Sequence, residues 1–135
     1  MKKVVLDTNL LFSALLSRSM SFRETLFNSP VRFFAAKYLI VEIFKHKERI
    51  IKASKAPEEK VYAYLHEVLA RIEFINEDFI STKSYLQANW LCRDIDENDT
   101  AHLALTLELE AEIWTNDEVL KIGLRKKGFN RFFEP

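Results

Sequence analysis

The chain has 135 residues, of which 48% are hydrophobic and 30% are charged. This length predicts one domain, residues 1–135, which can bury roughly two thirds of the surface of its unfolded chain. The composition is typical of a globular protein rather than a disordered or membrane one. Twenty basic residues balance twenty acidic ones, so the overall charge favours no particular class of partner.

The first residues do not predict export. Lys2 and Lys3 precede an apolar run, as in a signal peptide, but Asp7 interrupts that run early, and no later run reaches the length of a membrane span. The single cysteine, Cys92, cannot form an internal disulfide, which favours a reducing compartment. We therefore expect a cytoplasmic protein that is not inserted in a membrane.

The stretch Val4–Leu6 is an apolar run that ends abruptly in Asp7, Thr8 and Asn9. Such a run is typical of a strand buried on both faces. Polar residues directly after it lie at the carboxyl edge of the sheet, where open α/β sheets bind their ligands. A carboxylate that closes a buried strand also needs compensation, so Asp7 is the first candidate functional residue.

The rest of the chain alternates between helical and strand patterns. Helices are predicted over residues 10–16, 21–27, 39–55, 57–72, 78–91, 99–109 and 118–127. Strands are predicted over residues 31–35, 73–76 and 112–115, with a last edge strand over 129–133. The expected helix caps are Asn9, Ser21 with Glu24, and Asn98, and Gly128 is the expected stop. This alternation predicts an α/β fold with a mainly parallel sheet of four or five strands and right-handed crossovers.

Three further acids, Glu42, Asp99 and Asp117, stand at comparable junctions, and we expect all four to meet at one point. The set has no His or Cys at metal-ligand spacing, which favours Mg²⁺ or Mn²⁺ over zinc. At an effective dielectric of about 20, two unit charges about 4 Å apart repel by roughly 4 kcal/mol, so such a site takes up metal or protons. With metal bound, it can cleave phosphodiesters. Each acid also has a structural explanation, as a helix cap, a partner of a helix dipole or, for Glu42, a surface residue.

Two basic stretches flank these acids, between Lys45 and Lys55 and between Lys121 and Arg131. Solvated helix faces explain many such clusters. Two basic flanks beside an acidic centre also suit a polyanion laid across a metal site, and Lys45, Lys52 and Lys126 are the candidate phosphate contacts.

Four motifs in order resemble the PIN-domain nucleases. They are Asp7-Thr8-Asn9 after the first strand, Glu42 on the helix that follows the second strand, Asp96-Glu97-Asn98-Asp99 before an Ala/Leu-rich helix, and Trp114-Thr115-Asn116-Asp117 after a strand. The likeness extends from Met1 to Phe133. It implies a Rossmann-like three-layer sandwich with an acidic pocket, and Mg²⁺- or Mn²⁺-dependent cleavage of RNA. Many bacterial and archaeal members are toxins silenced by a cognate antitoxin, and dimers are frequent, so an antitoxin and a second copy of the chain are the partners implied.

The resemblance also implies a role for each matching residue. The metal-binding and catalytic acids are Asp7, Glu42, Asp99 and Asp117. Thr8, Asn9 and Thr115 match neighbours that hold those acids or the water. Asp96 matches the first acid of the paired motif and supports the ligands, with Asp94 as a competitor for that role.

The chain departs from the family pattern at three positions. His102 stands where a hydrophobic or aromatic residue is common, Thr106 where alanine is frequent, and Glu110 where a glycine usually ends the helix. These changes concern packing and helix termination more than the acids. His102 and His46, three and four residues after Asp99 and Glu42, are further candidates to face the pocket, beside structural or surface roles.

Three alternative functions remain to be weighed. A haloacid-dehalogenase-like phosphatase needs a second acid two residues after the first, where this chain has Asn9. A response-regulator receiver needs an acidic pair ahead of its phosphorylated aspartate, and nothing matching precedes Asp7. A catalytically silent PIN module that binds RNA or a protein is the alternative from another class, and the four intact acids argue against it.

Overall fold

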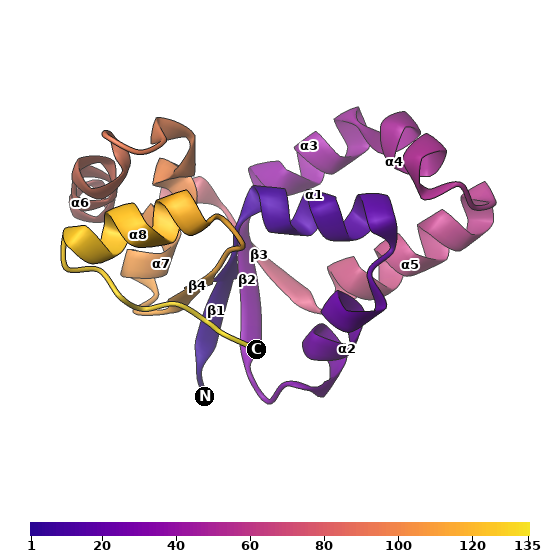
Figure 1. Ribbon diagram of the computed structural model, residues 1–135, viewed down its shortest axis with the longest axis horizontal. Coiled ribbons are helices and arrows are strands. Elements are labelled where there is room, and N and C mark those ends of the chain that lie inside the picture. Colours follow the sequence, from indigo (N-terminus) through magenta and orange to yellow (C-terminus); the bar gives the residue numbers. More distant parts are fainter.

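The computed structural model, which describes residues 1–135, has a central sheet of four parallel strands (Figure 1). The strands are β1 (Lys3–Leu6), β2 (Arg32–Ala36), β3 (Ile72–Ile75) and β4 (Glu112–Trp114), in the spatial order β3-β2-β1-β4. Val5 of β1 is in register with Phe34 of β2 and with Ile113 of β4. Because all four strands are parallel, their carboxyl ends lie at one edge of the sheet.

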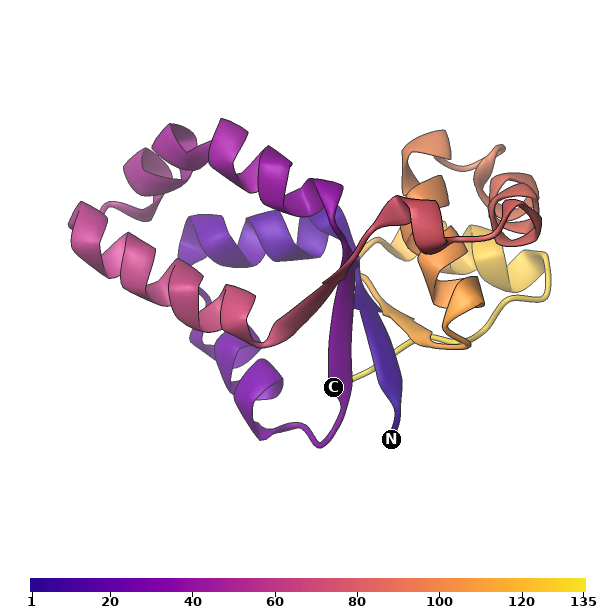
Figure 2. The same ribbon diagram turned by 180° about the vertical axis from the view of Figure 1, so that it is seen from behind.

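Helices cover both faces of the sheet, as the two opposite views in Figures 1 and 2 show. One side carries α1 (Thr8–Ser17), α2 (Met20–Asn28), α3 (Tyr38–Lys45), α4 (Lys47–Ser54) and α5 (Glu58–Ala70). The other side carries α6 (Thr82–Cys92), α7 (Thr100–Glu108) and α8 (Glu118–Lys126), with the short 3₁₀ turns η1 (Glu77–Phe79) and η2 (Glu97–Asp99). The predicted α/β sandwich is confirmed, with four strands.

The sheet separates two hydrophobic cores because successive strand residues point to opposite faces. Val4 and Leu6 of β1 belong to the core under α1 to α5, whereas Val5 belongs to the core under α6 to α8. The strands are therefore buried on both faces, which explains why Val4–Leu6 is apolar without alternation.

The expected helix caps differ from the observed ones. Asp7, not Asn9, caps α1, and its side chain accepts a hydrogen bond from the Asn9 N–H. Ser19 caps α2 through the Phe22 N–H, so the box with Ser21 as cap does not form. Asn98 lies inside η2, and α7 begins after Asp99. In each region two candidate caps lie within two residues, and the position where the chain leaves its extended path decides between them.

Three predicted elements are also corrected. The helix expected over residues 39–55 is interrupted at His46, which separates α3 from α4. The helix expected from residue 78 begins at Thr82, after η1. The last edge strand reduces to one parallel bridge between Ile113 and Phe132. Phe132 and Phe133 still point to opposite faces and pack into the two cores, as neighbouring strand residues do.

Gly128 ends α8 with a φ of +92°, as expected. No helix of the protein has both the length and the apolar character that a bilayer span requires.

Candidate functional site

Asp7 lies directly after β1 and is only 2% exposed. One carboxylate oxygen, Oδ1, accepts a hydrogen bond from the Asn9 N–H at 3.2 Å. The other, Oδ2, accepts one from the Thr115 hydroxyl at 2.6 Å. Both oxygens are thus held by donors from the ends of two neighbouring strands, which compensates the burial of the carboxyl group.

Thr115 also connects Asp7 to Asp117. Its Oγ1 accepts a hydrogen bond from the Asp117 N–H at 3.1 Å. The Asp117 side chain caps α8 by accepting from the Leu120 N–H at 3.0 Å. The two carboxylates line one cavity of about 280 Å³ together with Asn9, Leu10, Ser13 and Asn116.

Asp99 joins this group from the start of α7 and is 7% exposed. Burial, with additional repulsion from Asp7, Asp96 and Asp117, raises the pKa of Asp99 from 3.8 to about 7. Asp96 is exposed and caps η2 through the Asn98 N–H. Asp94, its competitor for the supporting role, instead pairs with Lys127 at 2.9 Å, which lowers the pKa of Asp94.

Glu42 lies apart from these acids, on α3. Its side chain is 38% exposed, and its Oε2 lies 3.6 Å from Nε2 of His46. Glu42 lines a separate cavity of about 400 Å³ with His46, Arg49 and Thr8. The two cavities share Asn9 and Ser13, so they adjoin across the first turns of α1.

The residues fit a hard dication by their chemistry. The donors are carboxylate oxygens, which Mg²⁺ and Mn²⁺ prefer, and the raised pKa of Asp99 records a repulsion that a cation would relieve. The carboxylates are not closed into a cage, since no three acidic, His or Cys side chains stand close enough together to hold a metal ion. Asp7, Asp99 and Asp117 thus share one acidic edge, and Glu42 faces it from the other side of α1.

His102 lies beside the acids but makes a different contact. Its Nε2 lies within hydrogen-bond distance of the Thr8 hydroxyl and 2.7 Å from the Tyr38 hydroxyl. Burial lowers the pKa of His102, so the ring is neutral near pH 7, and its Nδ1 has no partner. Thr8 therefore bonds to His102 and Tyr38 rather than to Asp7.

Tyr38 is a residue that the sequence patterns did not single out. Its only signal is its place directly after β2, at the same edge of the sheet as Asp7. Burial is the main cause of the raised pKa of its hydroxyl, so Tyr38 stays protonated and can donate.

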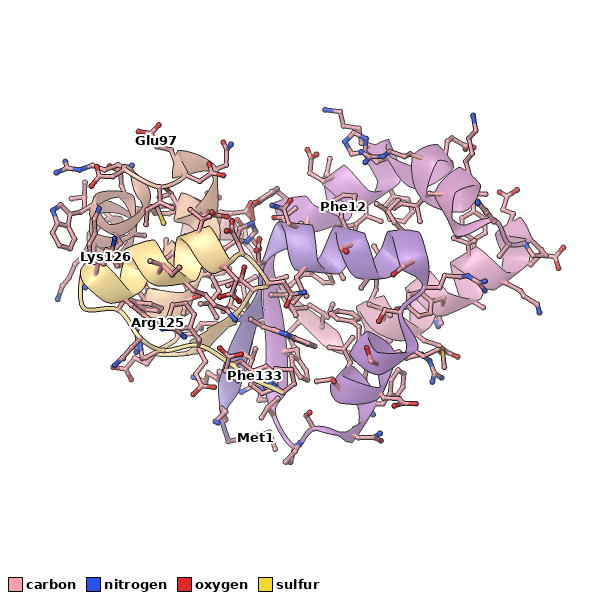
Figure 3. All side chains as sticks on the ribbon, in the orientation of Figure 1. Met1, Phe12, Glu97, Arg125, Lys126 and Phe133 are labelled. Carbon is pink, nitrogen blue, oxygen red and sulfur yellow. The ribbon has the colours of Figure 1, made fainter.

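The two basic stretches differ in how many cations are free. Lys45 and Lys52 are exposed and form no ion pair, on the helices α3 and α4 that contribute Glu42 and Arg49 to the second cavity. On the other side, Lys121 pairs with Glu118 and Glu134, and Lys127 pairs with Asp94. Lys126 is exposed on α8, far from α1 and its Phe12 (Figure 3).

Acidic side chains at the carboxyl edge of a parallel sheet define the class of α/β proteins that bind their ligand at that edge. A family model described as PIN domain matches residues 5–132, so the chain belongs to the PIN domain family. PIN domains are in general nucleases and typically use divalent metal ions. The search of curated proteins gives no match.

Proposed function

We propose that this protein is a Mg²⁺- or Mn²⁺-dependent endoribonuclease whose catalytic and metal-binding acids are Asp7, Glu42, Asp99 and Asp117. The observation that carries the proposal is the crowding of three acids from separate elements at one edge, where Asp99 has a pKa of about 7. Carboxylates that only cap helices have no need to be brought within repulsive range of one another, as Asp99 is with Asp7 and Asp117.

The side chains of the site have separate roles. Thr115 and the Asn9 N–H hold both oxygens of Asp7 in place. Asp117 keeps one oxygen for the Leu120 N–H and has the other free for a ligand. A bound Mg²⁺ or Mn²⁺ would supply an activated water and would stabilise the charge that develops on the cleaved phosphate. Asp96, exposed at the rim, adds negative charge that strengthens cation binding.

Glu42 would join the site from the side of α3. Its contact with His46 is long, at 3.6 Å, and its carboxylate is 38% exposed, so it can turn toward a cation without breaking a buried bond. Thr8 at the base of its cavity is held by Tyr38 and His102.

Single-stranded or structured RNA is the proposed substrate, and the unpaired cations support it. Lys45 and Lys52 have no acidic partner and lie on α3 and α4, the helices that contribute Glu42 and Arg49 to the second cavity, which suits phosphates that pass across the site. Lys126, exposed on α8, is a third proposed contact for RNA phosphates. The proposed setting is the cytoplasm, with a homodimer acting as the toxin of a toxin–antitoxin pair, and the support for it is the family resemblance alone.

A catalytically silent PIN module that binds RNA or a protein is the second candidate. The observation that favours it is the lack of any three side chains close enough to hold a metal ion. A dehalogenase-like phosphatase is not supported, because Asn9 occupies the position of its general acid and the chain belongs to another family.

The deciding experiment is cleavage of a fluorescent single-stranded RNA with Mg²⁺ or Mn²⁺, using wild-type protein, Asp7→Asn and the matched control Glu24→Gln, an exposed acid on α2. We expect metal-dependent cleavage that Asp7→Asn abolishes and Glu24→Gln leaves unchanged, with circular dichroism showing that both variants fold. Equal cleavage by Asp7→Asn would place the activity elsewhere or in a contaminant. RNA binding without cleavage would establish the silent module.

A further inference from the structure

A cavity of about 410 Å³ lies between α1 and α2, outside the acidic site. Its polar wall consists of five hydroxyl side chains and one amide, those of Ser13, Ser17, Ser19, Ser21, Thr25 and Asn116. No acidic or basic side chain lines it, and the remaining lining residues are Leu10, Ala14, Phe22, Trp114 and Pro135. Its volume falls in the range of about 300–1,000 Å³ that is usual for sites of small organic ligands.

This hydroxyl cavity adjoins the acidic edge. It shares Leu10, Ser13 and Asn116 with the cavity that Asp7 and Asp117 line. Asn9, Ser13 and Ser17 are four residues apart along α1, so they form one exposed polar stripe on a single face of the helix. The stripe rises about 12 Å, from the acids to the hydroxyls at the turn between α1 and α2.

The hydroxyl oxygens of Ser17 and Thr25 can act as hydrogen-bond acceptors for a ligand in the cavity, because their hydrogens are already donated within their own helices. Ser17 donates its hydrogen to the Ser13 carbonyl at 2.9 Å, and Thr25 donates to the Ser21 carbonyl at 2.9 Å. Each of these oxygens keeps lone pairs that point away from its own helix. The Asn116 amide adds two donors and an acceptor, so the wall can satisfy both kinds of hydrogen-bonding group.

The floor of the cavity is aromatic. Phe22 and Trp114 stack with ring centroids 5.1 Å apart, and each ring is at least nine-tenths buried. A neutral pocket with an aromatic floor and a hydroxyl wall does not fit a phosphate, which requires cations or free N–H groups. It fits a heterocyclic base with its ribose, since unstacked RNA bases are bound by aromatic contacts and edge hydrogen bonds.

We propose that this cavity is a nucleoside subsite, which takes the unstacked base and the ribose next to the phosphate held at the acidic edge. This inference rests on the proposed ribonuclease function and specifies that the substrate strand must be single-stranded at that nucleotide. The ribose 2′-OH, both donor and acceptor, finds partners among Ser13, Ser17 and Asn116, which favours RNA over DNA.

The test uses the fluorescence of Trp114. The chain has two tryptophans, so Trp90→Phe, at an exposed position on α6, leaves the indole of the cavity floor as the only one. RNA dinucleotides with an uncharged formacetal linkage in place of the phosphate, and their 2′-deoxy analogues, are titrated into this protein in the presence of EDTA. The acids then do not repel the ligand, and neither metal nor cleavage is needed. We expect a saturable change in Trp114 emission that is stronger for the RNA dinucleotides.

Three variants on the Trp90→Phe background localise the effect. Ser17→Leu fills the cavity and should weaken dinucleotide binding about tenfold. Thr25→Val removes one hydroxyl at constant shape and should weaken it by about threefold. Asn89→Leu changes an exposed position on α6, which lies on the opposite side of the sheet from α1 and α2 (Figure 1), and should leave dinucleotide binding unchanged. Thermal melting followed by circular dichroism checks that each variant folds.

The possible outcomes test nucleoside binding independently of the proposed ribonuclease activity. No change in Trp114 emission at millimolar dinucleotide, or an equal change in Ser17→Leu and in the Trp90→Phe parent, overturns the subsite, even if RNA cleavage depends on Asp7. A change that Ser17→Leu and Thr25→Val weaken supports nucleoside binding, even if no RNA is cleaved.

Discussion

The two sides of α1 present acids in opposite electrostatic states. On the side of α7 and α8, Asp7 and Asp99 are buried and face one another's charge, and the pKa of Asp99 rises to about 7. On the side of α3, Glu42 is half-exposed and lies 3.6 Å from His46. Carboxylates are thus crowded together on one side of α1, whereas on the other side a single carboxylate lies beside an imidazole.

Because of this difference, the two regions should contribute unequally to metal binding. Buried carboxylates that repel each other gain most from a dication, because desolvation strengthens both the repulsion and its relief. A half-exposed acid beside a histidine is screened by water and gains less. We therefore expect the buried group to dominate metal binding and cleavage, and Glu42 to contribute less.

The largest expected effect compares Asp117→Asn with Glu42→Gln in RNA cleavage. Asp117→Asn keeps the cap on α8, since an asparagine oxygen also accepts from the Leu120 N–H, yet it removes the charge of the half-buried carboxylate that shares a cavity with Asp7. We expect kcat/KM to fall at least about hundredfold for Asp117→Asn and about tenfold or less for Glu42→Gln. Equal losses would show that both sides of α1 act as one site.

Asp99→Asn should stabilise the metal-free protein at pH 8. The folded state keeps a proton on Asp99 between its ordinary pKa of 3.8 and about 7, whereas the unfolded chain has released it. Unfolding therefore releases a proton, and stability from this group falls as pH rises through that interval. We expect Tm at pH 8 to rise by about 5 °C in Asp99→Asn, with a smaller gain at pH 5. An equal gain at both pH values would contradict the raised pKa.

Mn²⁺ should stabilise the wild-type protein, because a ligand that binds only the folded state shifts the unfolding equilibrium. At ten times its Kd the expected rise in Tm is about 4 °C. Asp99→Asn should lose most of this rise, and Glu42→Gln should keep most of it. A flat Tm in wild type up to millimolar Mn²⁺ would argue for the silent module.

The salt dependence of RNA affinity tests whether basic residues on each side of the sheet contact the RNA. Lys52→Glu should reduce the slope of log K against log salt by about one or two, since Lys52 is exposed with no acidic partner. Lys126→Glu should do the same if the strand also crosses α8. Anisotropy of labelled RNA at several salt concentrations measures both slopes, and an unchanged slope in Lys52→Glu would remove α4 from the interface.

The smallest expected effect lies away from both regions. Glu110 follows α7 with a φ of 52°, a left-handed conformation that disfavours a side chain. Glu110→Gly should raise the free energy of unfolding by up to about 1 kcal/mol and leave cleavage unchanged. A lower denaturation midpoint in urea would mean that the glutamate side chain contributes contacts that outweigh the strain.

Much of this architecture could be predicted from short stretches of sequence. The apolar run before Asp7 predicts a doubly buried strand, and the alternation of helical and strand patterns predicts a parallel sheet. Because parallel strands end at one edge, the positions of Asp7 and Asp117 after their strands place both acids at that edge. The special position of Glu110, where a glycine is usual, is also visible locally, since a helix ends there.

Only the tertiary structure decided how these residues meet. The Thr115 hydroxyl holds Asp7 across 108 positions of the chain, and the packing of α7 buries Asp99 while α3 leaves Glu42 half-exposed. The same packing couples Thr8 to Tyr38 and His102 and opens the hydroxyl cavity between α1 and α2. Sequence patterns report which face of an element is apolar, whereas hydrogen-bond partners and pKa values depend on distances between elements that only packing determines.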